Sequence, residues 1–267
     1  MSWERSRENP QKAGGVTPGF FSLTGTCSDR YTEPERMKKM EHDLKVIARI
    51  RSPFPEKFGI PRQSGLVEKL QGKIVFEPEY RNPDALRGME EFSHLWLIWE
   101  FSENKREGWS ATVRPPRLGG NVRRGVFATR SPFRPNPLGL SCVKIERIEW
   151  ESSEGPVIWV SGADLMDGTP IFDLKPYLPY VDCKSDASGG FAEERRGYCL
   201  QVEVPEEIRP CIPPGKWQAI GEILAQDPRP SYQKDPERIY GMSFERWEIK
   251  FQVKEDRLTV CGVEERA

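Results

Sequence analysis

Apolar and polar residues alternate along several short stretches of the chain. From Leu44 to Arg51 apolar residues occupy every second position, which is typical of a strand with one buried face. Phe92–Phe101 is a long apolar run between polar segments, and it predicts a central strand buried on both faces. Shorter strands are predicted at Lys73–Glu77, Gly125–Thr129, Gly139–Ile148 and Val157–Gly162. Because turn residues rather than helical patterns separate them, we expect an antiparallel sandwich or barrel.

The pattern changes after residue 185. The stretch DASGG (Asp186–Gly190) predicts a linker. A strand, a helix and a closing hairpin are predicted beyond it, at Tyr198–Val204, Lys216–Gln226, and Trp247–Lys254 with Leu258–Val263. We therefore expect a mainly β domain at 44–185 and a small α+β domain at 186–267. Residues 1–43 are polar and lack a hydrophobic period, which predicts a poorly ordered N-terminal extension.

Composition excludes several classes of protein. The 267 residues carry a formal net charge of −1, so the molecule as a whole is not a general polyanion binder. No run approaches the ~18 apolar residues of a membrane span. The six cysteines are scattered without a CxxC spacing and there are two histidines, which argues against a metal centre and a disulfide framework. These features predict a cytoplasmic, reduced protein without metal.

The segment Val113–Ser141 is the most unusual part of the sequence. It contains six arginines, five prolines and four glycines, and no acidic residue. Proline and glycine restrict the backbone to particular bends, so the loop is shaped. Guanidinium groups on such a frame suit phosphate or carboxylate recognition, although a solvated basic loop is the alternative. We take this segment as the functional centre, with its arginines at Arg114, Arg117, Arg123, Arg124, Arg130 and Arg134.

Several common catalytic motifs are missing. The sequence has no GxGxxG after a first strand, no GxxxxGK[ST], no HExxH and no GxSxG. His94 lies within an apolar strand, where a satisfied core histidine is favoured over a catalytic one. These absences exclude a Rossmann-type cofactor site and a standard hydrolase triad.

Several long motifs, which follow one another along the chain, resemble one protein family. PFPEKFGIPRQ (Pro53–Gln63), GMEEFSHLWLIW (Gly88–Trp99), GVFATRSPFRPNPLGLS (Gly125–Ser141) and DLMDGTPIFDLKPY (Asp164–Tyr177) are similar to the TsaA/TrmO family of β-barrel methyltransferases. VRPPRLGGN (Val113–Asn121) and, in the C-terminal part, LAQDPRPSYQKD (Leu224–Asp235) extend the resemblance. It implies a mainly β fold, with an antiparallel β-barrel followed by the small α+β domain.

The resemblance also implies an activity. Members of the family use S-adenosylmethionine to methylate N6 of threonylcarbamoyladenosine immediately 3′ of the anticodon, at tRNA position 37. It implies a homodimer with tRNA as partner. The implied cofactor-binding positions are Pro61, Arg62, Gln63, His94, Leu95, Arg130, Leu140, Asp167, Gly168, Phe172, Asp173, Leu174 and Lys175.

Roles for these residues follow from the chemistry of the cofactor. Asp173 or Asp167 suits the ribose or the ammonium group, and Arg130 suits the carboxylate. Leu95 and Leu140 would wall the adenine. Asp173 and Tyr177 are the catalytic candidates for receiving the N6 proton, with His94 as a further acceptor. The expected tRNA contacts are Arg117, Arg123, Arg124 and Arg134.

Other interpretations remain. A non-catalytic barrel that binds RNA through arginines and exposed aromatic side chains is the main alternative. Without the resemblance, Asp164–Tyr177 also reads as a β-turn with aspartate caps. A phosphate-ester hydrolase would need metal ligands that the sequence lacks.

Overall fold

The computed structural model describes residues 43–103, 109–115, 122–195, 197–230, 233 and 235–266. The predicted extension 1–43 therefore lies outside the described residues except for Asp43. Leu44–Ala267 form one compact unit. Two hydrophobic cores lie within this unit, one inside the barrel and one in the C-terminal part.

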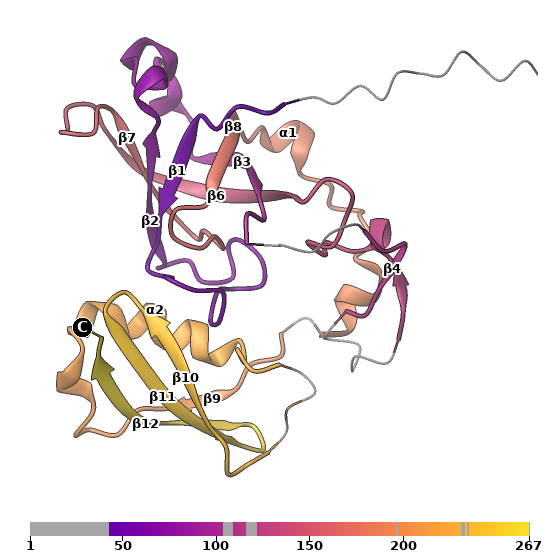
Figure 1. The fold of residues 1–267 in the computed structure, drawn as a ribbon, viewed down its shortest axis with the longest axis vertical. Helices are drawn as coiled ribbons and strands as arrows, with labels where there is room; N and C mark the ends of the chain where they lie inside the picture. The colour runs from indigo at the N-terminus through magenta and orange to yellow at the C-terminus, as the bar shows by residue number, and fades with distance from the viewer. Residues whose placement is uncertain are drawn as a thin grey trace, which may run out of the picture. The chain divides into compact units, whose positions relative to one another are not determined.

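Six strands of the described chain close into a barrel, in the ring order β1–β2–β7–β6–β3–β8 (Figure 1). Every neighbouring pair in the ring is antiparallel. Closure leaves no strand edge unpaired, so the barrel presents side chains rather than open backbone. The predicted fold class is confirmed. The strands are β1 (Ala48–Arg51), β2 (Gln71–Phe76), β3 (His94–Glu100), β6 (Leu138–Glu149), β7 (Val157–Ser161) and β8 (Pro170–Pro176).

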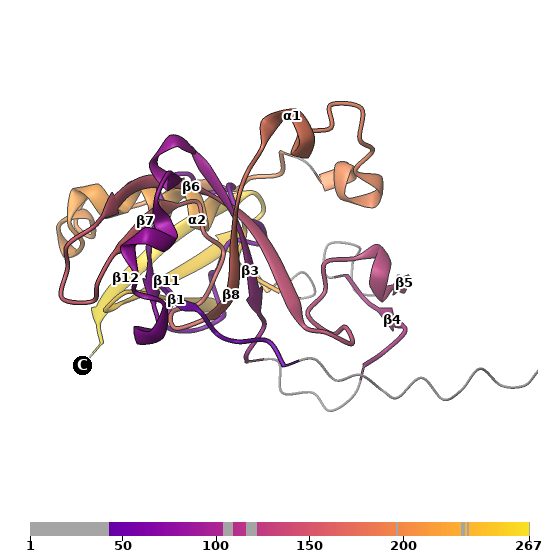
Figure 2. The same cartoon turned by 90° about the horizontal axis from the view of Figure 1, so that it is seen from above.

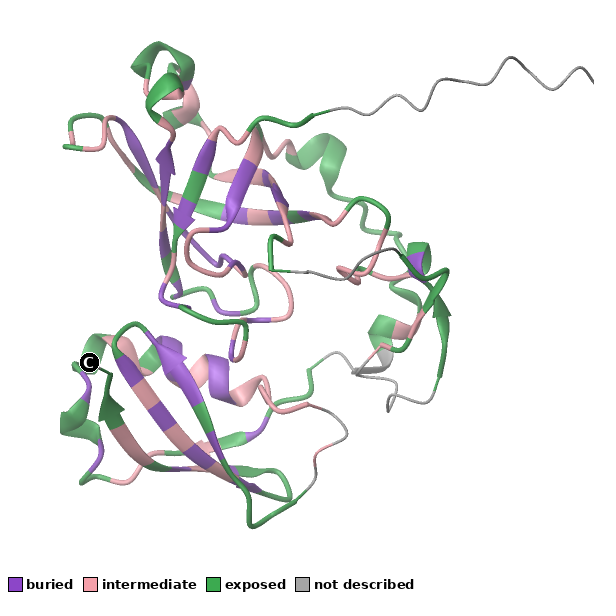
Figure 3. Ribbon diagram, in the orientation of Figure 1, coloured by how far each residue is buried: buried purple, intermediate pink, exposed green. Residues whose placement is uncertain are grey.

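The strand β3 shows how the barrel is filled. Leu95, Leu97 and Trp99 are buried, and the residues between them are half-buried, so buried and partly exposed positions alternate (Figure 3). The prediction that Phe92–Phe101 is buried on both faces is wrong. One face of β3 packs into the barrel core, and the other stays partly accessible because no second layer covers it fully.

The Arg-rich segment differs from its prediction. β4 (Thr112–Val113) and β5 (Arg124–Gly125) form a separate two-stranded sheet (Figure 2). The predicted strand Gly125–Thr129 is instead a short 3-10 helix, Val126–Ala128. The backbone N–H of Val126 donates to the Ala111 carbonyl, and the hydroxyl and backbone N–H of Thr129 both donate to the Val126 carbonyl. Val126 alone in that helix is buried, so the strand-like apolar run turns instead of extending.

The C-terminal part folds around a four-stranded sheet in the order β10–β11–β12–β9. The predicted helix and hairpin are confirmed as α2 (Pro214–Ala225) and as β11 (Trp247–Lys254) with β12 (Arg257–Glu265). β9 (Gln201–Glu203) lies parallel to β12, and β10 (Ile239–Phe244) is a strand that the pattern did not predict. The core of this sheet and α2 also takes in Phe54, Val67 and Leu70, which precede β2.

Short helices complete the described connections. No helix in these stretches is long and apolar enough to cross a membrane. Besides Val126–Ala128, the short helices are the 3-10 helices Pro78–Tyr80, Pro83–Leu86, Met89–Glu91, Gly190–Arg195 and Arg209–Cys211, and the single-turn helix α1 (Pro179–Asp182).

Candidate functional site

Three neighbouring strands, β6, β3 and β8, carry several of the predicted cofactor residues on their outer face. Their registers place Leu140 opposite Ile98 and Ile98 opposite Asp173, so these side chains form one cross-strand row. Trp96 and Lys175 form the next pair on the same face. The ammonium of Lys175 lies 2.9 Å from Oδ2 of Asp173. Side chains in such rows are close enough to share a ligand.

Leu140 supplies exposed apolar surface to this row. It is 56% exposed, whereas its neighbours Gly139 and Ser141 are buried against the barrel interior. The alternation along β6 therefore turns the Leu140 side chain outward, where a ligand or a second subunit can reach it.

Leu95 and Leu174 point the other way. Leu95 is fully buried in the barrel core, and Leu174, opposite Leu97, packs against the same core. The Leu95 side chain faces the barrel interior, so it does not join the outer row of Leu140 and Asp173, and its contact with the adenine stays a prediction. Its neighbour His94 lies on the partly exposed face instead.

An aromatic cluster of His94, Trp96 and Tyr177 lies where β8 ends, because Tyr177 directly follows that strand. The Tyr177 ring centroid is 6.1 Å from His94 and 5.7 Å from Trp96. The Trp96 indole N–H donates to Oδ2 of Asp182 at 3.0 Å. Hydrogen bonds from the Leu178 backbone and from Trp96 lower the pKa of the Asp182 carboxyl. Desolvation raises the pKa of the Tyr177 hydroxyl, so at neutral pH it is a donor rather than a base.

Gln63 and Arg130 contact each other beside β6. Nη1 of Arg130 donates to Oε1 of Gln63, and Nε2 of Gln63 donates to the Arg62 carbonyl at 2.5 Å. The Ser64 hydroxyl accepts a hydrogen bond from the backbone N–H of Cys142 at 3.1 Å. Two predicted cofactor residues from different loops thus touch each other, and the loop of Gln63 is fastened through Ser64 to the strand that carries Leu140.

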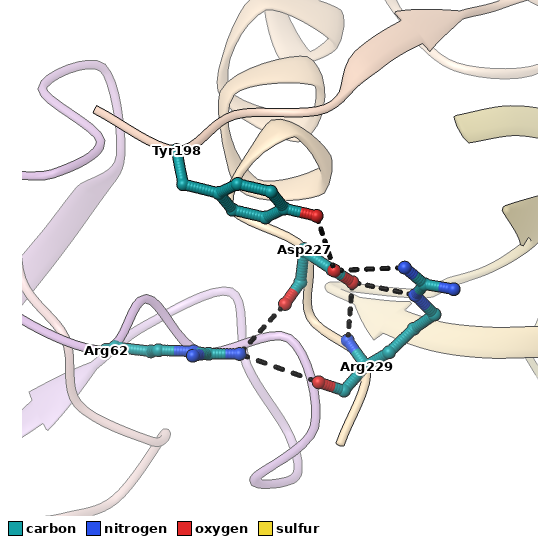
Figure 4. Close-up of polar contacts among 4 residues, drawn as sticks. All are labelled: Arg62, Tyr198, Asp227 and Arg229. Atoms are coloured by element: carbon teal, nitrogen blue, oxygen red, sulfur yellow. Dashed lines mark hydrogen bonds and ion pairs between the residues drawn. The ribbon is translucent and has the colours of Figure 1, made fainter. Parts of the chain in front are cut away.

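Arg62 is directed toward the C-terminal fold. Its Nη2 donates to the backbone carbonyls of Asp227 at 3.1 Å and Arg229 at 3.5 Å (Figure 4). Arg229 in turn binds both carboxylate oxygens of Asp227, at 2.8 and 3.0 Å, and this hydrogen bonding raises the pKa of the Arg229 guanidinium. The Tyr198 hydroxyl lies 3.5 Å from the same carboxylate. The loop that begins at the buried Pro61 is therefore tied to the turn 227–229.

A buried polar chain lies beneath the outer face, and the sequence did not reveal it. The Trp99 indole N–H donates to the Ser141 hydroxyl at 2.9 Å, and that hydroxyl donates to Oδ1 of Asp164 at 2.6 Å. Burial raises the pKa of Asp164, while hydrogen bonds from Ser141 and the backbone and the charge of Arg130 oppose that rise. The sequence does show Ser141 within an apolar strand, but it does not show that Trp99 and Asp164 are the hydrogen-bond partners of this serine.

Asp167 and Gly168 lie at the end of β1. Oδ1 of Asp167 accepts from the backbone N–H of Ser52 at 3.0 Å, and its Oδ2 is 3.7 Å from Nη1 of Arg51. Gly168 has a φ of +75° and donates its N–H to the Ile50 carbonyl at 2.8 Å. Asp167 therefore shapes this turn, and Asp173 is the carboxylate that joins the outer row.

Phe172 occupies a β-bulge just before that carboxylate. The β3–β8 register shifts between Ile98 and Trp99, which face Asp173 and Ile171, so Phe172 is the extra residue. A bulge bends the strand and redirects the side chains that follow it. The half-buried Phe172 thus helps to set where Asp173 points.

Arg123 and Arg124 are exposed at β5. Nη1 of Arg123 lies 3.4 Å from the Thr112 hydroxyl on β4. The Arg124 guanidinium lies 5.7 Å from the Phe191 ring centroid, in cation–π contact. Both predicted RNA contacts therefore project from a small folded sheet rather than from an open loop.

The two other predicted RNA contacts differ. Arg134 is half-buried and donates from Nη1 to the Thr129 carbonyl at 3.1 Å, so it stabilises the loop that contains it. Arg117 lies outside the described residues. Within the parts of the chain that the structure describes, no group of three or more His, Cys, Asp and Glu side chains is arranged to hold a metal ion.

Two family models match the chain in succession. The tRNA-methyltransferase O N-terminal domain matches residues 49–183, and the TrmO C-terminal domain matches residues 199–266. The barrel with its outer-face row falls in the first match, and the turn that binds Arg62 falls in the second.

Relatives and a solved structure agree with these matches. The tRNA (adenine(37)-N6)-methyltransferase of Escherichia coli is 40% identical over 82% of this chain and 97% of its own length. The enzyme of the same name from Eikenella corrodens is 50% identical over 64% of this chain and 97% of its own length. The crystal structure of TrmO from Pseudomonas aeruginosa matches with a TM-score of 0.67 at 34% identity, over 84% of this chain and 100% of that one. The chain belongs to the tRNA-methyltransferase O (TrmO) family.

Proposed function

We propose that this chain is an S-adenosylmethionine-dependent tRNA (adenine(37)-N6)-methyltransferase. Two relatives of that name, from Escherichia coli and Eikenella corrodens, align over 97% of their own length at 40% and 50% identity. One structural observation carries the proposal. Leu140, Asp173 and Lys175 share the outer face of β6, β3 and β8, and Gln63, on a loop fastened to β6 through Ser64, contacts Arg130 of the Arg-rich segment.

The residues of this face fit the cofactor. S-adenosylmethionine supplies an electrophilic methyl group on a sulfonium when it is bound. Its adenine needs apolar surface, which the exposed Leu140 offers. Its carboxylate suits the Arg130 guanidinium, and its ribose hydroxyls or ammonium suit the Asp173 carboxylate. Because methyl transfer is an in-line displacement, the main task of these residues is to align the reactants.

Asp173 is our candidate for receiving the N6 proton. It is a carboxylate on the proposed cofactor face, and Lys175 at 2.9 Å balances its charge. Tyr177 remains protonated and orients a substrate group by donating a hydrogen bond. The His94 ring contacts Tyr177 and shares a 2.8 Å hydrogen bond with the Ser93 hydroxyl, so it is held as part of the wall.

The tRNA would approach along the arginine-bearing sheet. Arg123 and Arg124 are exposed, and their charges suit phosphates of the anticodon stem-loop. We further propose that the methylated base carries a threonylcarbamoyl group, as the motif resemblance implies. We also propose that the protein acts in the cytoplasm, where its proposed tRNA substrate is found.

We propose that the active form is a homodimer with the outer face close to the subunit boundary. The 56% exposure of Leu140 supports this, because a second subunit would cover apolar surface that the barrel leaves open. The division at about residue 185 into a barrel domain and a C-terminal domain is part of the same proposal.

A methylation assay tests the proposed function. The purified chain is mixed with isotopically labelled S-adenosylmethionine and tRNA with or without the threonylcarbamoyl group, and nucleosides are analysed by mass spectrometry. We expect label on N6 of adenosine 37, and its loss in Asp173→Asn. If titration calorimetry detects tRNA binding but no binding of S-adenosylmethionine, the chain is the RNA-binding barrel of the alternative interpretation.

A further inference from the structure

Two large aromatic side chains of the Arg-rich segment are exposed together. Trp109 is 53% exposed and Phe127 is 70% exposed. Their rings are stacked, with centroids 6.1 Å apart and an interplanar angle of 29°. A stacked pair keeps one ring face of each partner available, and the high exposure of Phe127 leaves its ring open to solvent.

The backbone around the pair is fixed. Phe127 lies in the 3-10 helix Val126–Ala128, whose first residue, Val126, is buried. The Val126 N–H bonds the Ala111 carbonyl at 3.0 Å, two residues after Trp109. The Thr129 hydroxyl closes the turn by donating to the Val126 carbonyl at 2.8 Å. The rings are therefore presented on a folded support, which lowers the entropy lost when a ligand binds.

The surroundings of the pair are positively charged. Arg114, Arg123 and Arg124 are exposed. Arg124 lies on β5, Arg123 directly precedes it and Arg114 directly follows β4, and these two strands pair between the two aromatic residues. No acidic residue occurs in the sequence from Trp109 to Ser141. Aromatic rings interleaved with cations are the usual composition of a single-stranded nucleic-acid site, where rings stack on bases and cations bind phosphates.

We propose that Trp109 and Phe127 form a stacking platform for unpaired bases of the tRNA anticodon loop. This inference rests on the proposed function. Arg124 on β5 and Arg123 directly before it would bind the phosphates of the same loop, so that base and backbone contacts come from one small sheet and its ends.

Charge favours RNA over a second copy of the chain at this surface. A symmetric contact would bring the same patch of both copies together, and with it two sets of arginines without compensating acids. The phosphates of an unpaired loop provide the opposite charge, and its unstacked bases provide flat surfaces for the rings.

Alanine substitution tests the platform. Phe127→Ala and Trp109→Ala should each weaken binding of an anticodon stem-loop RNA by about 5- to 150-fold, the loss expected for one base–aromatic stack of about 1–3 kcal/mol. The salt dependence of binding should stay unchanged, because no phosphate contact is lost. In contrast, Arg123→Ala with Arg124→Ala should lower the salt slope by about 0.7 per contact removed.

Three controls make the result specific. Phe127→Tyr keeps the ring and should retain most of the affinity. Trp150→Ala removes another exposed tryptophan, 41% exposed but flanked by Glu149 and Glu151, and should bind RNA as the unchanged chain does. A fully paired RNA duplex should not distinguish Phe127→Ala from the unchanged chain. Circular dichroism verifies that each variant is folded.

The outcomes separate this inference from the proposed function. If the unchanged chain methylates tRNA and the folded Phe127→Ala and Trp109→Ala variants bind the stem-loop equally well, the platform is refuted and the proposed function stands. If these variants change the sedimentation coefficient of the free protein and leave RNA affinity intact, a second copy covers the rings and the platform is also refuted. If the unchanged chain does not methylate tRNA, the proposed function fails, and the platform still stands or falls with the stem-loop affinities of Phe127→Ala and Trp109→Ala.

Discussion

Replacing Arg62 by alanine should loosen the connection between its loop and the C-terminal fold. Nη2 of Arg62 donates to the Asp227 carbonyl at 3.1 Å and to the Arg229 carbonyl at 3.5 Å. A hydrogen bond from a charged donor contributes about 1.5–3 kcal/mol, and the longer of the two adds little. We expect the free energy of unfolding to fall by about 1.5–3 kcal/mol, which lowers Tm by about 3–12 °C in a chain of this size.

Arg229→Ala should act on the same carbonyls indirectly. The Arg229 and Asp227 side chains are only 11% and 16% exposed, so the ion pair is largely shielded from water. Asp227 has a φ of +52°, a left-handed conformation that is costly for a residue with a Cβ. The ion pair holds this turn with its carbonyls toward Arg62. The two substitutions should therefore be non-additive, with a coupling of about 0.5–3 kcal/mol in a double-mutant cycle.

Thermal unfolding and titration of S-adenosylmethionine on the same variants separate a structural role of Arg62 from a ligand role. Arg87→Ala is the matched control, because its ion pair with Asp84 is 79% and 70% exposed and should contribute no more than about 0.5 kcal/mol. Arg62→Lys keeps the charge and should recover part of the lost stability. If Arg62→Ala leaves Tm unchanged and lowers only the affinity for S-adenosylmethionine, Arg62 binds the cofactor directly and its proposed structural role is refuted.

Arg130→Ala should weaken S-adenosylmethionine binding about ten- to a hundredfold in titration calorimetry, because the cofactor carboxylate loses a charged partner; unchanged affinity would assign Arg130 to the RNA. Burial raises the pKa of Asp164, so the native state holds this proton more tightly than the unfolded chain and stability falls as pH rises through the raised pKa. Urea unfolding at successive pH values above the usual carboxyl range should show that fall, and Asp164→Asn should lack this contribution; an identical pH dependence in both would disprove the assignment. Gly139→Ala would place a methyl group against the buried Trp99 ring and should lower the unfolding free energy by about 1–3 kcal/mol, whereas an unchanged denaturation midpoint would show that the ring can move aside.

The barrel could be predicted because its strands have a local signature. Period-two alternation and turn residues identify β1 and β6 from neighbouring positions alone. The burial of β3 was misjudged because its half-buried residues Trp96 and Ile98 are as apolar as the buried residues that alternate with them. Local pattern also failed at Val126–Ala128, where one buried valine and a threonine hydroxyl turn an apolar run into a 3-10 helix.

The site was predicted less well because it depends on register and on distant partners. The outward direction of Leu140 and the inward direction of Leu95 follow from strand pairing, which a motif does not specify. Arg62 stands in a motif that resembles a cofactor loop, and its contacts lie 165 and 167 residues away. Ser141 and Asp164 are joined by a bond that depends on the closed barrel.

The composition of the C-terminal core determines when the chain can finish folding. Three of its apolar side chains, Phe54, Val67 and Leu70, come from the segment before β2 and are synthesised early. Their partners in β11 and β12 are synthesised last among the described strands. Such separation in sequence slows folding, and apolar side chains that wait for their partners promote aggregation. A chain whose synthesis stops before Arg257 therefore lacks β12, and with it part of the C-terminal hydrophobic core.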